Sequence, residues 1–138
     1  MIRFENGIFS LETETLGYYM GIRGELVETL HFGRRLHPTA DALSEKHATV
    51  YGGAIPYAGN DDLLHLCLEV SPTDKGDFRR TALELRLADG SGVVQFRFAS
   101  HAIHEGSLPP DSLPGAHGAA ETLELVFDSP QGITLRQF

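Results

Sequence analysis

The chain has 138 residues, with 11 Lys and Arg against 19 Asp and Glu, and a formal net charge of −8. This length fits one domain and excludes a (β/α)₈ barrel, which needs about 200 residues or more. The negative charge disfavours nucleic acids and anionic membrane surfaces as partners, and no apolar run is as long as a transmembrane helix. Because the N-terminal residues show no secretory signal, we expect a cytoplasmic protein.

The N-terminal residues show the alternation of apolar and polar positions that is typical of strands. Residues 2–13 alternate on both sides of Asn6-Gly7, a pair suited to a tight hairpin turn. Residues 18–22 and 26–32 predict two further strands separated by Gly24, although the second of them alternates less regularly. We therefore expect a hairpin followed by two strands.

The middle of the chain has weaker signals. Pro38 lacks an amide donor and is expected to end the preceding strand. Residues 39–47 could form one or two helical turns capped by Thr39, but the segment is too short to decide between helix and loop. Residues 51–62 are dense in Gly, Pro and Asn and predict an ordered loop, a kind of segment that often carries binding groups.

Regular alternation returns in the second half of the chain. Residues 82–87 and 93–98 predict a hairpin around the turn residues 89–92, and residues 99–105 extend its outgoing strand. After a Pro-rich connection over residues 106–115, a last strand pair is expected at 122–128 and 132–138.

Many short strands joined by Gly- and Pro-rich turns predict an all-β fold, an antiparallel β-sandwich. The chain reaches Phe138 within a strand pattern, which would leave an unpaired edge in a complete domain. We therefore expect residues 1–138 to form a single sandwich domain or the N-terminal part of a truncated one.

Several residues with chemical potential do not form a convincing site by spacing alone. His101 and His104 point to opposite faces of a strand, so no metal site and no cofactor are expected. The adjacent Asp61 and Asp62 are poorly placed for glycosidase chemistry, because the two carboxylates of such enzymes flank the scissile bond. Cys67 lies in an apolar run and is expected to be a small buried residue without chemistry.

Aromatic and charged residues are interleaved in the middle of the chain in a way that suits sugar recognition. Sugars offer apolar C–H faces to aromatic rings and hydroxyl groups to carboxylates and guanidinium groups. The aromatic candidates for a sugar platform are Tyr51, Tyr57 and Phe78, with Asp61, Asp62, Asp77, Arg79 and Arg80 beside them. A packed and capped loop without ligand is the alternative interpretation.

Three segments together resemble the N-terminal β-sandwich of glycoside hydrolase family 36, the bacterial α-galactosidases. They are residues 26–36, which contain an aromatic residue, Gly and two basic residues before Leu36; residues 76–86, which begin Gly-Asp-Phe-Arg; and residues 88–103, continuing to Gly106 and Leu113-Pro114. Their order and spacing agree with the family along nearly the whole chain. The family commonly has Ser-Pro after Gly-Asp-Phe-Arg, whereas Arg80 and Thr81 follow here.

The resemblance implies a galactose-mutarotase-like supersandwich that precedes a (β/α)₈ barrel in enzymes that release terminal α-linked galactose. The nucleophile and the acid/base of such retaining enzymes are barrel Asp residues, so no catalytic residue is expected in this chain. The implied partners are the catalytic barrel of the same polypeptide, further subunits of a homo-oligomer and an α-galactoside sugar.

The resemblance also implies that loops of this domain reach the rim of the sugar pocket. Asp77 and Arg79 are the rim candidates, with Asp41 behind them; a structural role, in which Asp77 and Arg79 pair with each other or fix the strand entry, stays open. The resemblance favours a non-catalytic support domain. The alternatives are a free-standing carbohydrate-binding module and a module that dimerises through an open sheet edge.

Overall fold

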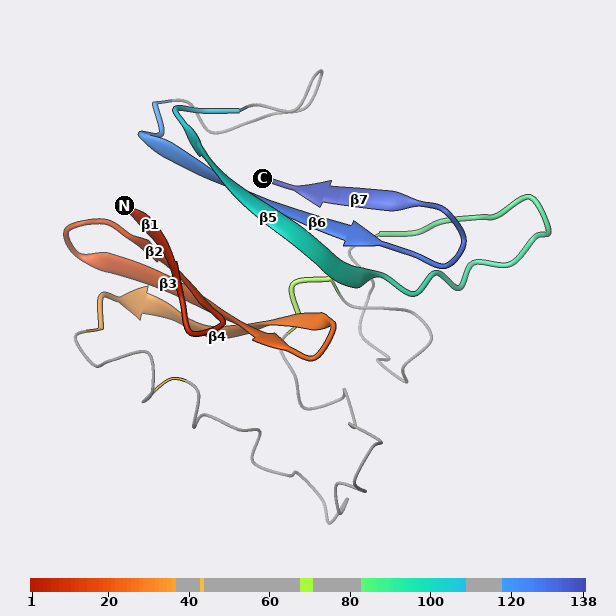
Figure 1. The fold of residues 1–138 in the computed structure, drawn as a ribbon, viewed down its shortest axis with the longest axis horizontal. Coiled ribbons are helices and arrows are strands. Elements are labelled where there is room, and N and C mark those ends of the chain that lie inside the picture. Colours follow the sequence, from red (N-terminus) through yellow and green to blue (C-terminus); the bar gives the residue numbers. More distant parts are fainter. Residues whose placement is uncertain (37–42, 44–67, 71–82, 109–117) are drawn as a thin grey trace, which may run out of the picture.

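The computed structural model describes residues 1–36, 43, 68–70, 83–108 and 118–138. The described strands form two antiparallel sheets that lie face to face, with strand orders β1-β2-β3-β4 and β5-β6-β7 (Figure 1). The strands are β1 (Ile2–Glu5), β2 (Ile8–Glu12), β3 (Leu16–Arg23), β4 (Leu26–Arg34), β5 (Arg97–Glu105), β6 (Glu121–Asp128) and β7 (Thr134–Gln137). The prediction of an all-β antiparallel sandwich is confirmed.

The first sheet is a meander that begins with the predicted hairpin. Glu5 pairs with Ile8 across a two-residue loop, in which Asn6 has φ 51° and Gly7 has φ 77°. Positive φ at both positions is the geometry whose twist matches the flanking strands, and it explains why Asn-Gly is suited to this turn.

The pairing of β3 with β4 explains the irregular alternation of the fourth strand. Tyr19 pairs with His31 and Met20 with Thr29, so Leu30 is an extra residue in a β-bulge. The bulge places Leu30 and His31 on the same side of the sheet, the outer side, next to Tyr19. The strand prediction for residues 26–32 is confirmed, and the bulge at Leu30 explains why apolar and polar residues alternate less regularly there.

The second sheet contains the last strand pair that the sequence predicts. β6 pairs antiparallel with β7, and the connecting turn contains Gly132 at φ 76° and a hydrogen bond from Ser129 N to Ile133 O of 3.0 Å. β5 pairs with β6 along its length, as the predicted extension of its strand to Glu105 requires.

The predicted hairpin of residues 82–87 and 93–98 is wrong in its strands. Its turn is present, since Asp89 accepts a hydrogen bond from Ser91 N and Gly90 has φ 85°, but no strand is assigned from Leu83 to Phe96. Val94 and Phe96 are nevertheless buried, as alternation predicts. Alternation reports which side chains face the core, whereas a strand also needs a paired backbone neighbour.

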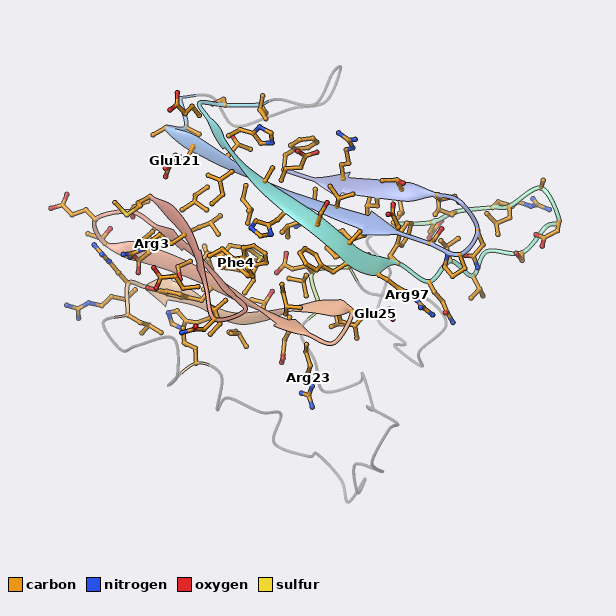
Figure 2. The ribbon with its side chains drawn as sticks, in the orientation of Figure 1. Arg3, Phe4, Arg23, Glu25, Arg97 and Glu121 are labelled. Atoms are coloured by element: carbon orange, nitrogen blue, oxygen red, sulfur yellow. The ribbon has the colours of Figure 1, made fainter. Side chains whose placement is uncertain are left out.

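One apolar core fills the space between the sheets. Phe9 is fully buried, and its ring stacks on that of Phe4 with centroids 4.4 Å apart. Figure 2 shows the Phe4 side chain between the two sheets. The other buried members of this core are Met20, Val27, Val94, Phe96, Leu123, Leu125 and Phe127. Hydrogen bonds from backbone amides join the two layers at both ends: Phe98 N donates to Glu25 O at 2.7 Å, and Ile2 N donates to the Glu121 side-chain oxygen Oε2 at 2.7 Å.

Several predictions fall on residues outside the described part. They are the helical turns at 39–47 apart from Leu43, the loop at 51–62, the role of Pro38, Cys67, and most of the Pro-rich connection. Within the described part, no helix has both the length and the apolar character needed to span a membrane.

Candidate functional site

All residues that the sequence predicts to contact sugar lie outside the described residues. This holds for the rim candidates Asp41, Asp77 and Arg79 and for the platform candidates Tyr51, Tyr57 and Phe78, as well as for Asp61 and Asp62. Their roles stay predictions. The described residues show instead how charged and polar groups hold the two sheets together.

The two histidines of β5 face opposite sides of the sheet, as the sequence predicts. The ring of His101 lies among core aromatic residues, with centroids 4.4 Å from Phe4 and 5.0 Å from Phe9. His104 Nε2 lies 2.8 Å from Glu124 Oε2 on the other face. Among the residues that the structure describes, no group of three His, Cys, Asp or Glu side chains converges as a metal site would require.

A buried carboxylate lies on the outer face of the first sheet. The Glu12 side chain is only 7% exposed, and its Oε2 pairs with Arg3 Nη2 at 2.5 Å and Arg35 Nη2 at 3.1 Å. Tyr19 Oη donates to Glu12 Oε1 at 2.7 Å and accepts a hydrogen bond from Leu36 N at 3.1 Å. We call these four side chains, Arg3, Glu12, Tyr19 and Arg35, the Glu12 network.

The electrostatics of the Glu12 network are those of a structural carboxylate. Burial alone would raise the pKa of Glu12, but the hydrogen bond from Tyr19 and the charges of Arg35 and Arg3 hold this pKa below its ordinary value. A carboxylate kept ionised and fully paired is a poor proton donor at neutral pH. Through the contacts of Arg35 with Glu12 and of Leu36 with Tyr19, the network holds the chain that leaves β4 against the outer face.

The position of the Tyr19 side chain explains why residue 17 is a glycine. A Cβ at Gly17 would lie 2.5 Å from Cε2 of Tyr19, whose side chain crosses directly over that position. Tyr19 also packs with Ile8, Leu30 and Leu43 in a second, smaller core on the outer face. The sequence does not predict the network, although alternation along the hairpin places Arg3 and Glu12 on one face.

A shallow groove adjoins the Glu12 network. It has a volume of about 390 Å³ and is lined by Glu14, Thr15, Leu16, Arg34 and Arg35. Thr13 Oγ1 caps the β2–β3 turn beside it by accepting from Leu16 N at 3.0 Å. Both signs of charge line the groove, so the charges select no particular ligand.

A second carboxylate network lies between the sheets at the β4 edge. Leu68 forms an antiparallel bridge with Glu28, which brings Glu69 next to β4. Tyr18 Oη and Thr29 Oγ1 both donate to Glu69 Oε1, and Gln137 Nε2 of β7 donates to its Oε2 at 3.0 Å. Glu69 therefore joins the first sheet, the bridging segment and the second sheet through one side chain.

Tyr18 provides a spectroscopic test of this Glu69 contact. Burial, followed by the hydrogen bond to Glu69 and its negative charge, raises the pKa of Tyr18 to about 12. We expect Glu69→Gln to lower this pKa, because the charge that opposes tyrosinate is removed. The measurement is the ultraviolet absorbance of tyrosinate against pH, with Tyr18→Phe identifying the residue. An unchanged titration in Glu69→Gln would contradict the contact.

The raised pKa of Tyr18 makes the free energy of unfolding depend on pH in the alkaline range. The folded state holds the Tyr18 proton more tightly than the unfolded chain, so the contribution of Tyr18 is complete below the ordinary pKa of 10.0. It is lost as the pH rises through about 12. The protein is therefore expected to lose stability in strong alkali over this interval.

Three of the described carboxylates, Glu12, Glu69 and Glu124, are held by neighbouring side chains. The mechanism of a retaining glycosidase needs two carboxyl groups about 5 to 5.5 Å apart across an open sugar site. Within the described ranges, Glu12 is held by Arg3, Arg35 and Tyr19, and Glu69 by Tyr18, Thr29 and Gln137. Glu124 is held by His104 and Arg136. These groups stabilise the sandwich.

Comparison with known proteins identifies the same type of domain. Residues 25–136 match the profile of the glycosyl hydrolase family 36 N-terminal domain. No curated protein matches the chain significantly.

Solved structures share the fold at low sequence identity. The galactosidase domain of an α-galactosidase-sucrose kinase superposes with a TM-score of 0.74 and 21% identity over 95% of this chain. A family 36 α-galactosidase variant from Geobacillus stearothermophilus, solved with raffinose, gives 0.73 and 24% over 94%. The α-galactosidase from Lactobacillus brevis gives 0.72 and 22% over 94%. The chain spans only 20%, 19% and 19% of these three proteins, respectively.

Proposed function

The chain belongs to the glycosyl hydrolase family 36 N-terminal domains, and we propose that it supports an α-galactosidase barrel within one polypeptide. The barrel supplies both catalytic carboxylates and hydrolyses terminal α-galactosides by the retaining mechanism. The sandwich packs on the barrel and contributes to a homo-oligomer. The compartment that we propose is the cytoplasm.

The observation that carries this proposal is the match of residues 25–136 to the family's N-terminal domain. The contacts of three described carboxylates agree with this proposal. Glu12, Glu69 and Glu124 are each satisfied by neighbours within the sandwich, so they serve the fold. In this proposal the catalytic groups belong to the barrel.

The sandwich has a second role in this proposal, at the rim of the sugar pocket. Asp77 and Arg79, with Asp41 behind them, are the residues that we propose to face the substrate. A carboxylate and a guanidinium group suit sugar hydroxyls because they offer fixed acceptors and donors. Their support is the Gly-Asp-Phe-Arg motif that begins at Gly76.

The test compares this chain with the longest polypeptide that its coding region encodes, on an α-galactoside with a chromogenic leaving group. We expect hydrolysis by the longer product alone. Within that product, Asp77→Asn should raise KM by about tenfold, a loss of one hydrogen bond to substrate. The matched control is Glu84→Gln, an exposed acidic residue of the described part, which should leave KM unchanged.

A different result would favour one of the alternatives. Binding of galactosides by the 138-residue chain without hydrolysis, lost in Tyr51, Tyr57 or Phe78 variants, would indicate a carbohydrate-binding module. A mass that doubles with concentration and no sugar binding would indicate a dimerising module.

A further inference from the structure

The tip of the β1–β2 hairpin carries the residue order that favours deamidation. Asparagine is among the thermolabile residues, and a following glycine offers a backbone nitrogen without a shielding side chain. Asn6 is exposed, and a Cβ added to Gly7 would meet no atom of the described residues within 4 Å, so water reaches this turn. The other asparagine of the chain, Asn60, precedes Asp61 and lacks this glycine.

Deamidation is an attack of the backbone on the side chain, and it needs no reagent except water. At this turn Gly7 N would attack Asn6 Cγ, lose its proton and expel the side-chain nitrogen as ammonia, which leaves a cyclic succinimide. Water then adds to one of the two ring carbonyl groups and opens the ring. The products are aspartate and isoaspartate, and in isoaspartate the backbone runs through the former side chain.

The folded turn holds the two reacting atoms apart. Positive φ at Asn6 and Gly7, 51° and 77°, defines a type I′ turn, in which ψ at the first central residue is about 30°. At this ψ the next nitrogen lies nearly opposite Cβ across the Cα–C bond and cannot reach Cγ. A flip of the Asn6–Gly7 peptide gives a type II′ turn, with ψ there of about −120°, and brings Gly7 N beside Cγ. Both turn types serve two-residue hairpin loops, so Glu5 and Ile8 stay paired.

The flipped turn is a minor state of this hairpin. Type II′ turns take glycine at the first central position, because positive φ with an extended ψ is strained for a residue with a side chain. Asn6 meets this strain on flipping, whereas its observed left-handed conformation is one that asparagine tolerates. Reaction therefore requires a rare conformation of one peptide group, without unfolding of the domain.

The Asp-Gly pair of the other described turn, which has the same ring chemistry open to it, is protected. Gly90 N donates to Leu87 O at 2.9 Å, so the attacking nitrogen is already engaged. Ser91 N donates to Asp89 Oδ1 at 2.9 Å. Hydrogen bonds from Ser91 lower the pKa of Asp89, so its carboxylate stays ionised and lacks a leaving group. The geometry therefore favours reaction at Asn6 and opposes it at Asp89.

We propose that Asn6 is a deamidation site and that the flip of the Asn6–Gly7 peptide limits its rate. The aspartate product keeps the backbone of the turn, since Asp-Gly also suits type I′. The isoaspartate product adds one backbone carbon to a loop whose flanking residues, Glu5 and Ile8, are paired. A two-residue turn does not accommodate that carbon, so β1 loses its register with β2.

The register of β1 maintains contacts in both sheets. It stacks the Phe4 ring on Phe9 with centroids 4.4 Å apart, and it brings Ile2 N to Glu121 Oε2 of β6 at 2.7 Å. Isoaspartate at the turn therefore weakens the edge of the first sheet and its link to the second.

The test incubates the 138-residue chain at mildly alkaline pH, folded and in guanidinium chloride, and follows the tryptic peptide of residues 4–23 by mass spectrometry. We expect Asn6 to convert in both states, about ten- to a hundredfold more slowly in the folded chain because of the strained flip. Asp89→Asn is the matched control. It places Asn-Gly where Gly90 N is hydrogen-bonded, and it should convert more slowly than Asn6 in the folded chain. The isolated isoaspartate form should unfold at a lower urea concentration than Asn6→Asp.

Three results would overturn the proposal. Equal rates in the folded and unfolded chains would show that the turn does not limit the reaction. Conversion confined to guanidinium chloride would show that the reaction requires unfolding and that a peptide flip is not enough. An isoaspartate form as stable as Asn6→Asp would show that β1 keeps its register.

Discussion

Replacing Phe9 with alanine is expected to lower the free energy of unfolding by about 3 to 5 kcal/mol, the range for truncating a fully buried phenylalanine. Phe9 is 0% exposed and contacts the rings of Phe4, Phe98 and His101 from both sheets. Truncation removes apolar contact area and leaves a cavity where the two layers meet. Urea denaturation followed by circular dichroism measures the loss.

Phe32→Ala is the matched control, because it makes the same chemical change in the same sheet. Phe32 is 73% exposed, so its truncation should cost about 0.5 kcal/mol or less in the 138-residue chain. A comparable loss in both variants would contradict the assignment of Phe9 to the inner core and Phe32 to an uncovered surface.

Local turn chemistry made much of the fold predictable. Asn6 and Gly7 provide the two positive φ angles of the first turn, and Gly24 takes φ 60° between the next two strands. Each signal lies within the few residues that it organises, so a single sequence suffices to recognise it. The bulge at Leu30 was not predicted, although it accounts for the less regular alternation of residues 26–32.

The error in the second half of the chain has a definite physical cause. Residues 83–96 alternate because Leu85, Leu87, Val94 and Phe96 face the core. Alternation constrains side-chain direction, but strand pairing depends on where a neighbouring backbone lies. That position is set by the whole fold and is not encoded in the segment.

The hydrogen-bond networks between residues far apart in the chain could not be predicted either, because they also depend on how the whole fold is arranged. Tyr18 and Glu69 are 51 residues apart, and Glu69 and Gln137 are 68 apart. Nothing in a local pattern indicates that a particular carboxylate will meet a particular hydroxyl or amide across two layers. The domain type, by contrast, was predictable, because the resemblance rests on three segments in a fixed order and the family match over residues 25–136 confirms it.

Glu12→Gln is expected to lower the free energy of unfolding by about 1 to 3 kcal/mol at neutral pH, because it removes the charge that Arg3 and Arg35 share. The lower part of this range is set by solvent screening, since the two arginines are 45% and 37% exposed. The amide retains an acceptor for Tyr19, so the variant isolates the charge. Glu5→Gln, an exposed change on the neighbouring strand, is the control and should cost almost nothing.

The pH dependence of this difference identifies its origin. The pKa of Glu12 is lowered in the folded state, so its contribution is complete above the ordinary value of 4.5 and is lost as the pH falls through the lower, folded value. The stability gap between the wild-type chain and Glu12→Gln should therefore be constant at neutral pH and close progressively in acid. Denaturation measured across this range tests it. A gap that persists undiminished in acid would show that Glu12 stabilises the sheet by packing or hydrogen bonding, and that its charge contributes nothing.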